Sequence, residues 1–245
     1  MSGHSKWANI KHQKGKVDAI RGKVTTKIGR EITIAVRLGG ADLIGNMRLK
    51  LAMQKAKANN IPKENIQRAI QKGQGALAGV NYEEIVYEGY GPAGVAVMIE
   101  ILTDNRNRTA ADIRHLFSIY GGNLGESGCV SWMFKHKGLV VVETGGISEE
   151  DLLMIVIEAG AEDMKVEEGA FEIITAPEDF EAVVQALEAN HIEPVIAEIT
   201  MLPETIAELD EADSDKMVKL LEILEEHDDV QNVYSNFDIP EEEEE

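Results

Sequence analysis

Hydrophobic and polar positions recur with two different periods along this chain, and the change of period divides it. Between residues 17 and 73 the apolar positions return every three to four residues, which is typical of amphipathic helices. Three helices are expected there, over residues 17–38, 42–58 and 62–72. Paired glycines or asparagines follow the first two, and Pro62 suits the first turn of the third. The pattern predicts a small all-helical domain.

From residue 80 onward the period changes to two, which is typical of half-buried strands. Residues 80–135 predict the order strand, strand, helix, strand, with the helix beginning at Thr109 and the last strand at residues 129–134. Residues 138–202 predict strand, helix, strand, strand, helix, strand, the order of a ferredoxin-like domain. The segment after residue 203 predicts a strand, a helix and a strand, which would complete the unit of residues 80–135.

We therefore expect a multidomain α+β fold with a basic helical domain and two ferredoxin-like α/β domains, the third inserted into the second. The expected parts are a basic arm and helical domain over 1–79, a discontinuous middle domain over 80–135 and 203–240, an inserted acidic domain over 136–202, and a disordered acidic tail over 241–245. The Gly-rich run of residues 73–79 is the clearest linker.

Charge is segregated along the same axis. The formal net charge is -20, yet residues 1–75 hold 16 Lys and Arg against 4 Asp and Glu, whereas residues 138–245 hold 3 against 33. A basic end on an acidic protein indicates a polyanionic partner for that end. The acidic helices near the other end are most simply solvated faces, and a protein partner on the acidic domain is the alternative.

One set of side chains in the basic end is a candidate nucleic-acid site. Lysines beside an aromatic ring suit single-stranded nucleic acid, because the cations contact phosphates while the ring stacks on a base. Cations of the first helix share one narrow arc, where they repel one another unless an anion offsets them. A solvated helix face, and a Trp7 that only docks the arm, are the alternatives. The candidates are Lys6, Trp7, Lys11, His12, Lys14, Lys16, Lys23, Lys27, Arg30 and Arg37.

A second candidate is a phosphate site where the polar loop meets the helix expected after it. The free amides and the dipole of a helix N-terminus favour anions, and arginines lie beside them. Pairing of these arginines with the abundant carboxylates of the protein is the alternative. The residues of this candidate site are Asn105, Arg106, Asn107, Arg108 and Thr109.

The sequence offers little support for catalysis. The single cysteine, Cys129, lies in an expected strand, and the six histidines lack zinc-site spacing. The glycines of residues 121–128 follow a helix and precede a strand, the reverse of the order in a phosphate-binding loop. We expect no enzyme activity, no cofactor and no metal. The lack of paired cysteines fits the reducing cytoplasm, and no apolar run is long enough to predict a membrane span.

Several long segments are similar to one known family. GHSKWANIKHQKG, NNIPKENIQRAIQKG, YEGYGPAGVAVMIEILTDNRNRTAADIRHLF and GGNLGESGCVSWMF resemble the YebC/PmpR family, the bacterial relatives of a mitochondrial translational activator. The resemblance covers essentially the whole chain. It implies three domains, the third inserted into the second. It also implies a role in gene expression, since members are named as transcriptional regulators that bind DNA and are implicated in translation through proline runs.

Two functional hypotheses follow. The first is a cytoplasmic DNA-binding transcriptional regulator, which needs side chains that reach base edges, whereas the basic end offers mainly Lys and Arg for phosphates. The second is a translation factor on the ribosome, which would use the same basic arm on rRNA or tRNA. The sequence leaves open which nucleic acid is the target.

Overall fold

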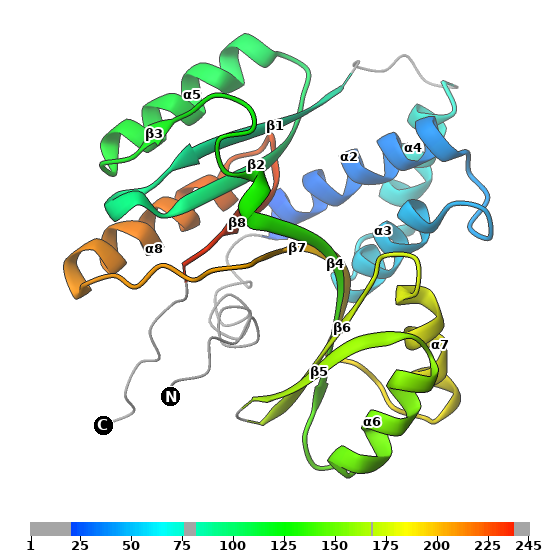
Figure 1. Cartoon of the computed structure of the whole chain (residues 1–245). Helices are drawn as coiled ribbons and strands as arrows, with labels where there is room; N and C mark the ends of the chain where they lie inside the picture. The colour runs from blue at the N-terminus through cyan, green and yellow to red at the C-terminus, as the bar shows by residue number, and fades with distance from the viewer. Residues whose placement is uncertain (1–20, 76–81, 168, 238–245) are drawn as a thin grey trace. The chain divides into compact units, whose positions relative to one another are not determined.

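The computed structural model describes residues 21–75, 82–167 and 169–237, which form an α+β fold with two four-stranded antiparallel sheets (Figure 1). The described residues divide into two compact units. One contains residues 21–75, 82–131 and Leu209–Ser235, and the other contains residues 236–237 and the described part of Trp132–Glu208. The expected domain limits differ from these units and stay predictions.

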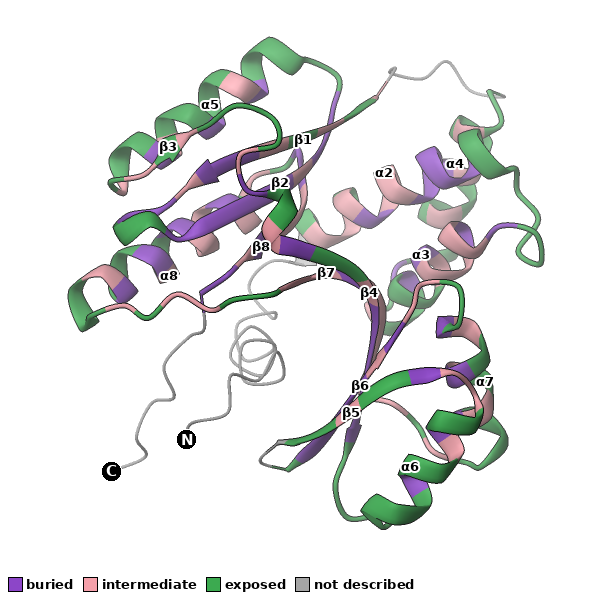
Figure 2. Cartoon of the chain, viewed as in Figure 1, coloured by how far each residue is buried: buried purple, intermediate pink, exposed green. Residues whose placement is uncertain are grey.

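Three helices make up the N-terminal part of the first unit: α2 (Arg21–Gly39), α3 (Met47–Ala58) and α4 (Lys63–Gly73). Both α3 and α4 pack on α2, and the apolar positions expected from the helical period face one another. Figure 2 shows buried positions along α2 and exposed positions on the outer sides of α3 and α4. The shared core consists of Ile28, Ile32, Ala35, Val36, Leu49, Ala52, Ala56, Ile61 and Ala69.

Asn46 sets the corner between α2 and α3. Its side-chain oxygen accepts a hydrogen bond from the Leu49 amide at 3.0 Å and caps α3. Its side-chain nitrogen donates to the carbonyl oxygens of Ala35 and Gly40, each at 2.8 Å. The expected start of this helix at residue 42 is wrong, because Asp42 instead accepts from the Ile44 amide within the preceding turn.

The first sheet has the order β3-β1-β2-β8, built from β1 (Glu83–Tyr90), β2 (Ala96–Thr103), β3 (Asn123–Leu124) and β8 (Val230–Ser235). Helices α5 (Arg106–Ile119) and α8 (Glu211–Glu226) contact this sheet and each other. The pairing of β8 with β2 confirms that the last strand of the chain joins the sheet begun by residues 83–103. The strand expected soon after residue 203 is wrong, because that segment forms only an isolated bridge between Ala207 and Phe237.

The strand expected at residues 129–134 is wrong. Glu88 of β1 is buried, and its carboxylate accepts hydrogen bonds from the amides of Gly128, Val130 and Ser131 at 2.7–2.9 Å. Residues Ser131–Met133 form a 3-10 turn, and the next strand begins at Phe134. Burial by itself raises the pKa of Glu88, but these amides lower it below its ordinary value. The loop of residues 128–131 is therefore held by the charged carboxylate of Glu88.

The second sheet has the order β5-β6-β4-β7. Its elements follow one another as expected for a ferredoxin-like domain: β4 (Phe134–Glu143), α6 (Glu149–Glu158), β5 (Ala161–Glu167), β6 (Ala170–Thr175), α7 (Phe180–Ala189) and β7 (Ile196–Pro203). The helices α6 and α7 contact each other, and the central strands β4 and β6 are largely buried (Figure 2). The fold class predicted from the sequence is confirmed.

Candidate nucleic-acid interface

The ten residues of the first candidate site, the nucleic-acid site, are divided between the described and undescribed parts of the chain. Four of them lie on α2, namely Lys23, Lys27, Arg30 and Arg37. Those of the arm lie outside the described residues and stay predictions, namely Lys6, Trp7, Lys11, His12, Lys14 and Lys16.

Lys23, Lys27, Arg30 and Arg37 form the basic stripe of α2. The N-terminal part of this stripe faces the C-terminal end of α8. The Lys23 ammonium lies 3.5 Å from the Glu226 carboxylate, and the Lys27 ammonium donates to the carbonyl oxygen of Glu225. These acceptors belong to the last turn of α8, where the helix dipole and the free carbonyl groups attract cations. The anion that offsets this part of the stripe is therefore the protein itself.

Lys27 is partly buried at this contact. Burial lowers the pKa of its ammonium to about 8, although the carboxylates of Glu225 and Asp228 raise it. The positive charges of Lys23 and Arg30 lower it further. Since a desolvated ammonium is a poor partner for an external phosphate, Lys27 is better explained as part of the contact between α2 and α8.

Arg30 extends the same contact to Asp229, which is 3% exposed. Its guanidinium donates to the Asp229 carboxylate and to the Asp228 carbonyl oxygen, both at 2.7 Å, and lies over the ring of Tyr82, 5.3 Å from its centroid. The guanidinium is thus held on one side by a carboxylate and on the other by an aromatic face.

Asp229 also holds the start of α5. Its second carboxylate oxygen lies 2.8 Å from the Arg108 guanidinium, 2.7 Å from the Thr109 hydroxyl and 3.0 Å from the Thr103 hydroxyl. Burial alone raises the pKa of Asp229, but these donors together with Arg30 lower it well below its ordinary range. The carboxylate is therefore charged at neutral pH and joins α2, β2 and α5.

The expected phosphate site lies at this same place, and its members have internal partners. Asn105 caps α5 by accepting from the Arg108 amide at 3.1 Å, and Arg108 also pairs with Asp104 at 2.9 Å. Helix α5 starts at Arg106, earlier than the expected Thr109, which is buried beside Asp229. Arg106 and Asn107 are exposed. A phosphate site stays a prediction, and the contacts of Arg108 favour the alternative in which arginines pair with carboxylates.

Exposed cations without a carboxylate partner among the described residues lie elsewhere in the helical domain. On α4, Lys63, Arg68 and Lys72 are exposed and have only Glu64 as an acidic neighbour on their own helix. Arg37 of α2 and Lys57 of α3 are likewise exposed. Apart from Arg37, these residues were not among the sequence candidates, although the helical periods of residues 42–58 and 62–72 already placed them outside the apolar faces.

Metal-binding side chains and the single cysteine are the remaining candidates for catalysis in the described residues. No group of three or more His, Cys, Asp and Glu in them is arranged to hold a metal ion. Burial, with the nearby charges of Glu88 and Glu126, raises the pKa of the Cys129 thiol, which makes it a poor nucleophile. No helix in this part of the chain has the length and apolar character needed to cross a bilayer.

Comparisons with known proteins identify the family. The model described as TACO1/YebC protein N-terminal domain matches residues 5–76, and the TACO1/YebC second and third domain matches residues 82–237. A protein of Pelotomaculum thermopropionicum named as a probable transcriptional regulatory protein is 57% identical over 98% of this chain and 99% of its own length. A protein of the same name from Moorella thermoacetica is 58% identical over 98% and 96%.

A solved structure agrees with the sequence relatives. The crystal structure of a conserved hypothetical protein from Aquifex aeolicus has a TM-score of 0.85 and 50% identity, covering 98% of this chain and 100% of that one. The helical part and the two sheets described above thus have counterparts in a solved protein that this chain matches over its whole length. Because both domain models match and the relatives are 57–58% identical over nearly the whole chain, the chain belongs to the TACO1/YebC family.

Proposed function

We propose that this protein is a cytoplasmic regulator of transcription that binds duplex DNA through its N-terminal helical domain. The observation that carries the proposal is the set of exposed, unneutralised cations on a protein of net charge -20. Cations without an internal counter-charge are the ones that gain most from phosphate groups, because binding releases the counterions of the DNA. These residues are Arg37, Lys57, Lys63, Arg68 and Lys72.

The names of the relatives support the regulatory role. The Pelotomaculum and Moorella proteins are both named as probable transcriptional regulatory proteins. The contacts of α2 refine the proposed surface, since Lys23, Lys27 and Arg30 already have partners at the end of α8. The proposal therefore places DNA on α3, α4 and the end of α2, together with the arm.

Salt-dependent binding tests the proposal. Affinity for a labelled duplex of about 30 base pairs is measured by fluorescence anisotropy from 0.05 to 0.3 M salt. Changing Lys57, Lys63 and Lys72 to Gln should reduce the slope of log K against log salt by about 0.9 per lysine. The matched control changes Lys165, Lys216 and Lys219, three exposed lysines outside the helical domain, to Gln. It should leave the slope unchanged.

Three outcomes would overturn the proposal. Absence of binding to the duplex at 0.15 M salt would remove DNA as the partner. Tighter binding to a structured RNA hairpin than to the duplex, lost in the Lys57, Lys63 and Lys72 variant, would make translation the regulated process. An equal loss of DNA affinity in the control variant would show that overall charge, rather than this surface, determines binding.

A further inference from the structure

Helices α3 and α4 are joined by a short, well-defined turn. Only the residues 59–62 separate Ala58 from Lys63. Asn60 adopts the left-handed conformation with φ of 51°, which Asn tolerates better than most residues. Ile61 is buried, and its amide donates to the carbonyl oxygen of Ala56 at 3.0 Å. Two helices connected in this way and packed on a third have the organisation of a helix-turn-helix unit.

The second helix of this unit, α4, has one apolar and one wholly polar side. With 100° per residue, Ile66, Ala69 and Ile70 lie on the side that packs on α2, in agreement with their burial. The rest of the wheel carries two rows along the helix axis with a spacing of four residues. One row is Lys63, Gln67 and Gln71, and the other is Glu64, Arg68 and Lys72.

This polar side is open. The side chains of Lys63, Glu64, Gln67, Arg68 and Gln71 line a surface hollow of about 420 Å³. Within the ranges that the structure describes, neither glutamine makes a hydrogen bond to another side chain, and Arg68 has no carboxylate partner. Figure 2 shows exposed positions along α4. The donors and acceptors of this side are therefore free to contact a ligand.

The residue types on this side match the edges of base pairs. In the major groove, Gln forms paired hydrogen bonds with adenine, and Arg forms them with guanine. Lysines at the two ends of the helix suit phosphates. A helix with the 11 residues of α4 is about 16 Å long, enough to lie in a groove about 12 Å wide. The net positive charge of the face complements the duplex.

We propose that α4 is a recognition helix that enters the major groove of duplex DNA. Gln67, Arg68 and Gln71 contact base edges, while Lys63 and Lys72 contact the phosphates on either side. The inference rests on the proposed DNA binding and adds to it, because it predicts that the protein distinguishes sequences rather than binding every duplex equally. It also supplies the base-reading residues that the lysines of the arm do not provide.

A duplex with a filled major groove tests this inference without knowledge of the target sequence. Two duplexes are compared that both contain 5-hydroxymethylcytosine, one of them glucosylated. The glucose occupies the major groove and leaves the phosphates and the minor groove unchanged. The wild-type protein should bind the glucosylated duplex about tenfold more weakly or worse. The affinities of the double variant Gln67→Ala/Gln71→Ala for the two duplexes should differ less. Gln185 is an exposed glutamine on α7, and Gln185→Ala should behave as wild type.

Arg68→Lys separates base contact from charge. It keeps the positive charge but loses the paired donors, so the slope against log salt should stay the same while the sequence preference selected from a random duplex pool weakens. Equal affinity of the wild type for the two modified duplexes would overturn the recognition-helix inference and leave the proposed DNA binding intact. Binding to neither duplex would instead contradict the proposed function itself. Circular dichroism establishes that each variant is folded.

Discussion

Asp229 joins three segments that are distant in the sequence. Arg30 comes from α2, Thr103 from the end of β2, and Arg108 with Thr109 from α5. Since removing one member of a buried ionic cluster leaves the other charges without a partner, Asp229→Ala should lower the free energy of unfolding by about 3–5 kcal/mol. Equilibrium unfolding in urea measures this change.

Asp228→Ala is the matched control for this substitution. Asp228 is exposed and offers Arg30 only its backbone carbonyl oxygen, which the substitution retains. A change within about 0.5 kcal/mol is expected, as at most surface positions. Equal losses in the two variants would show that the donors around Asp229 contribute no more than a surface carboxylate.

The same carboxylate makes stability dependent on pH in the acid range. The pKa of Asp229 in the folded protein lies below its ordinary value because Arg108, Thr109, Arg30 and Thr103 outweigh the effect of burial. As pH falls through about 3.9, the unfolded chain binds a proton before the folded protein does. The contribution is complete above that pH and is lost below it.

Urea midpoints measured at pH 6, 4 and 3 test this dependence. They should fall more steeply for the wild type than for Asp229→Asn, since the amide cannot titrate. Glu88, whose pKa is also lowered, titrates in both proteins and cancels in the comparison. Parallel curves for the two proteins would mean that Asp229 is not a source of the acid sensitivity.

At the level of elements, α2 and α4 approach each other closely at Gly73. A Cβ atom at this position would lie 2.6 Å from the Thr33 carbonyl oxygen and 2.7 Å from the Val36 Cβ. Gly73→Ala should therefore destabilise the helical domain by about 1–3 kcal/mol through overpacking, although Ala favours helices by about 1 kcal/mol over Gly. Thermal unfolding followed by circular dichroism measures the change.

Gly29 provides the control for helix propensity, because a Cβ atom there meets nothing within 4 Å. Gly29→Ala in α2 should raise the stability by up to about 1 kcal/mol. A stabilising effect of Gly73→Ala as well would contradict the close packing of α4 on α2.

The periodicity of the sequence predicted most of these elements, since each period depends on nearby residues alone. It failed at residues 129–134, where Val130, Trp132 and Phe134 alternate like a strand. The carboxylate of Glu88, about 40 positions earlier, accepts hydrogen bonds from the amides of Val130 and Ser131. These amides are therefore not available to pair with a neighbouring strand. Such a contact leaves no trace in the local pattern.

The candidate interface illustrates the same limit. The stripe of cations on α2 predicted an anion opposite it, but the pattern could not reveal that the anion is the end of α8, some 200 residues away. The polar side of α4 was visible in the helical period of residues 62–72. Charge density does not reveal it, because Gln67 and Gln71 carry no charge.

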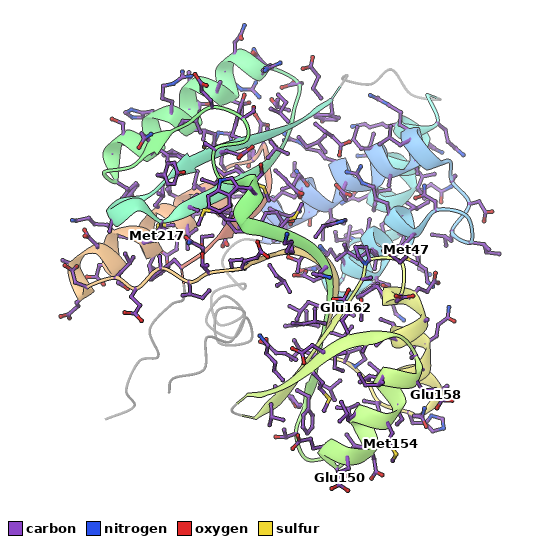
Figure 3. The ribbon with its side chains drawn as sticks, viewed as in Figure 1. Met47, Glu150, Met154, Glu158, Glu162 and Met217 are labelled. Atoms are coloured by element: carbon purple, nitrogen blue, oxygen red, sulfur yellow. The ribbon has the colours of Figure 1, made fainter. Side chains whose placement is uncertain are left out.

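At the level of the whole molecule, the acidic part of the chain counteracts the basic end. Helix α6 exposes Glu150 and Glu158 on its outer side, with Met154 between them (Figure 3). The residues from 138 onward carry 33 Asp and Glu against 3 Lys and Arg. In the proposed DNA binding, the helical domain would therefore attract the duplex, and most of the remaining chain, which is acidic, would repel it.

The salt concentration sets the distance over which these charges act on DNA, because dissolved ions screen them. Screening lengths are about 30 Å at 0.01 M and about 10 Å at 0.1 M, so repulsion by acids that do not contact the DNA acts mainly at low salt. The slope of log K against log salt should consequently be shallower between 0.01 and 0.05 M than between 0.1 and 0.3 M. Fluorescence anisotropy with one duplex over both ranges measures the two slopes.

Removing part of the acidic charge provides the control. A variant that lacks residues 241–245 and carries Glu149→Gln, Glu150→Gln and Glu158→Gln loses acids that lie outside the helical domain. Its low-salt slope should steepen toward the value seen at higher salt, while affinity above 0.1 M stays unchanged, because the cations at the interface are the same. A wild-type slope that is uniform over both ranges would show that DNA binding depends on the helical domain alone.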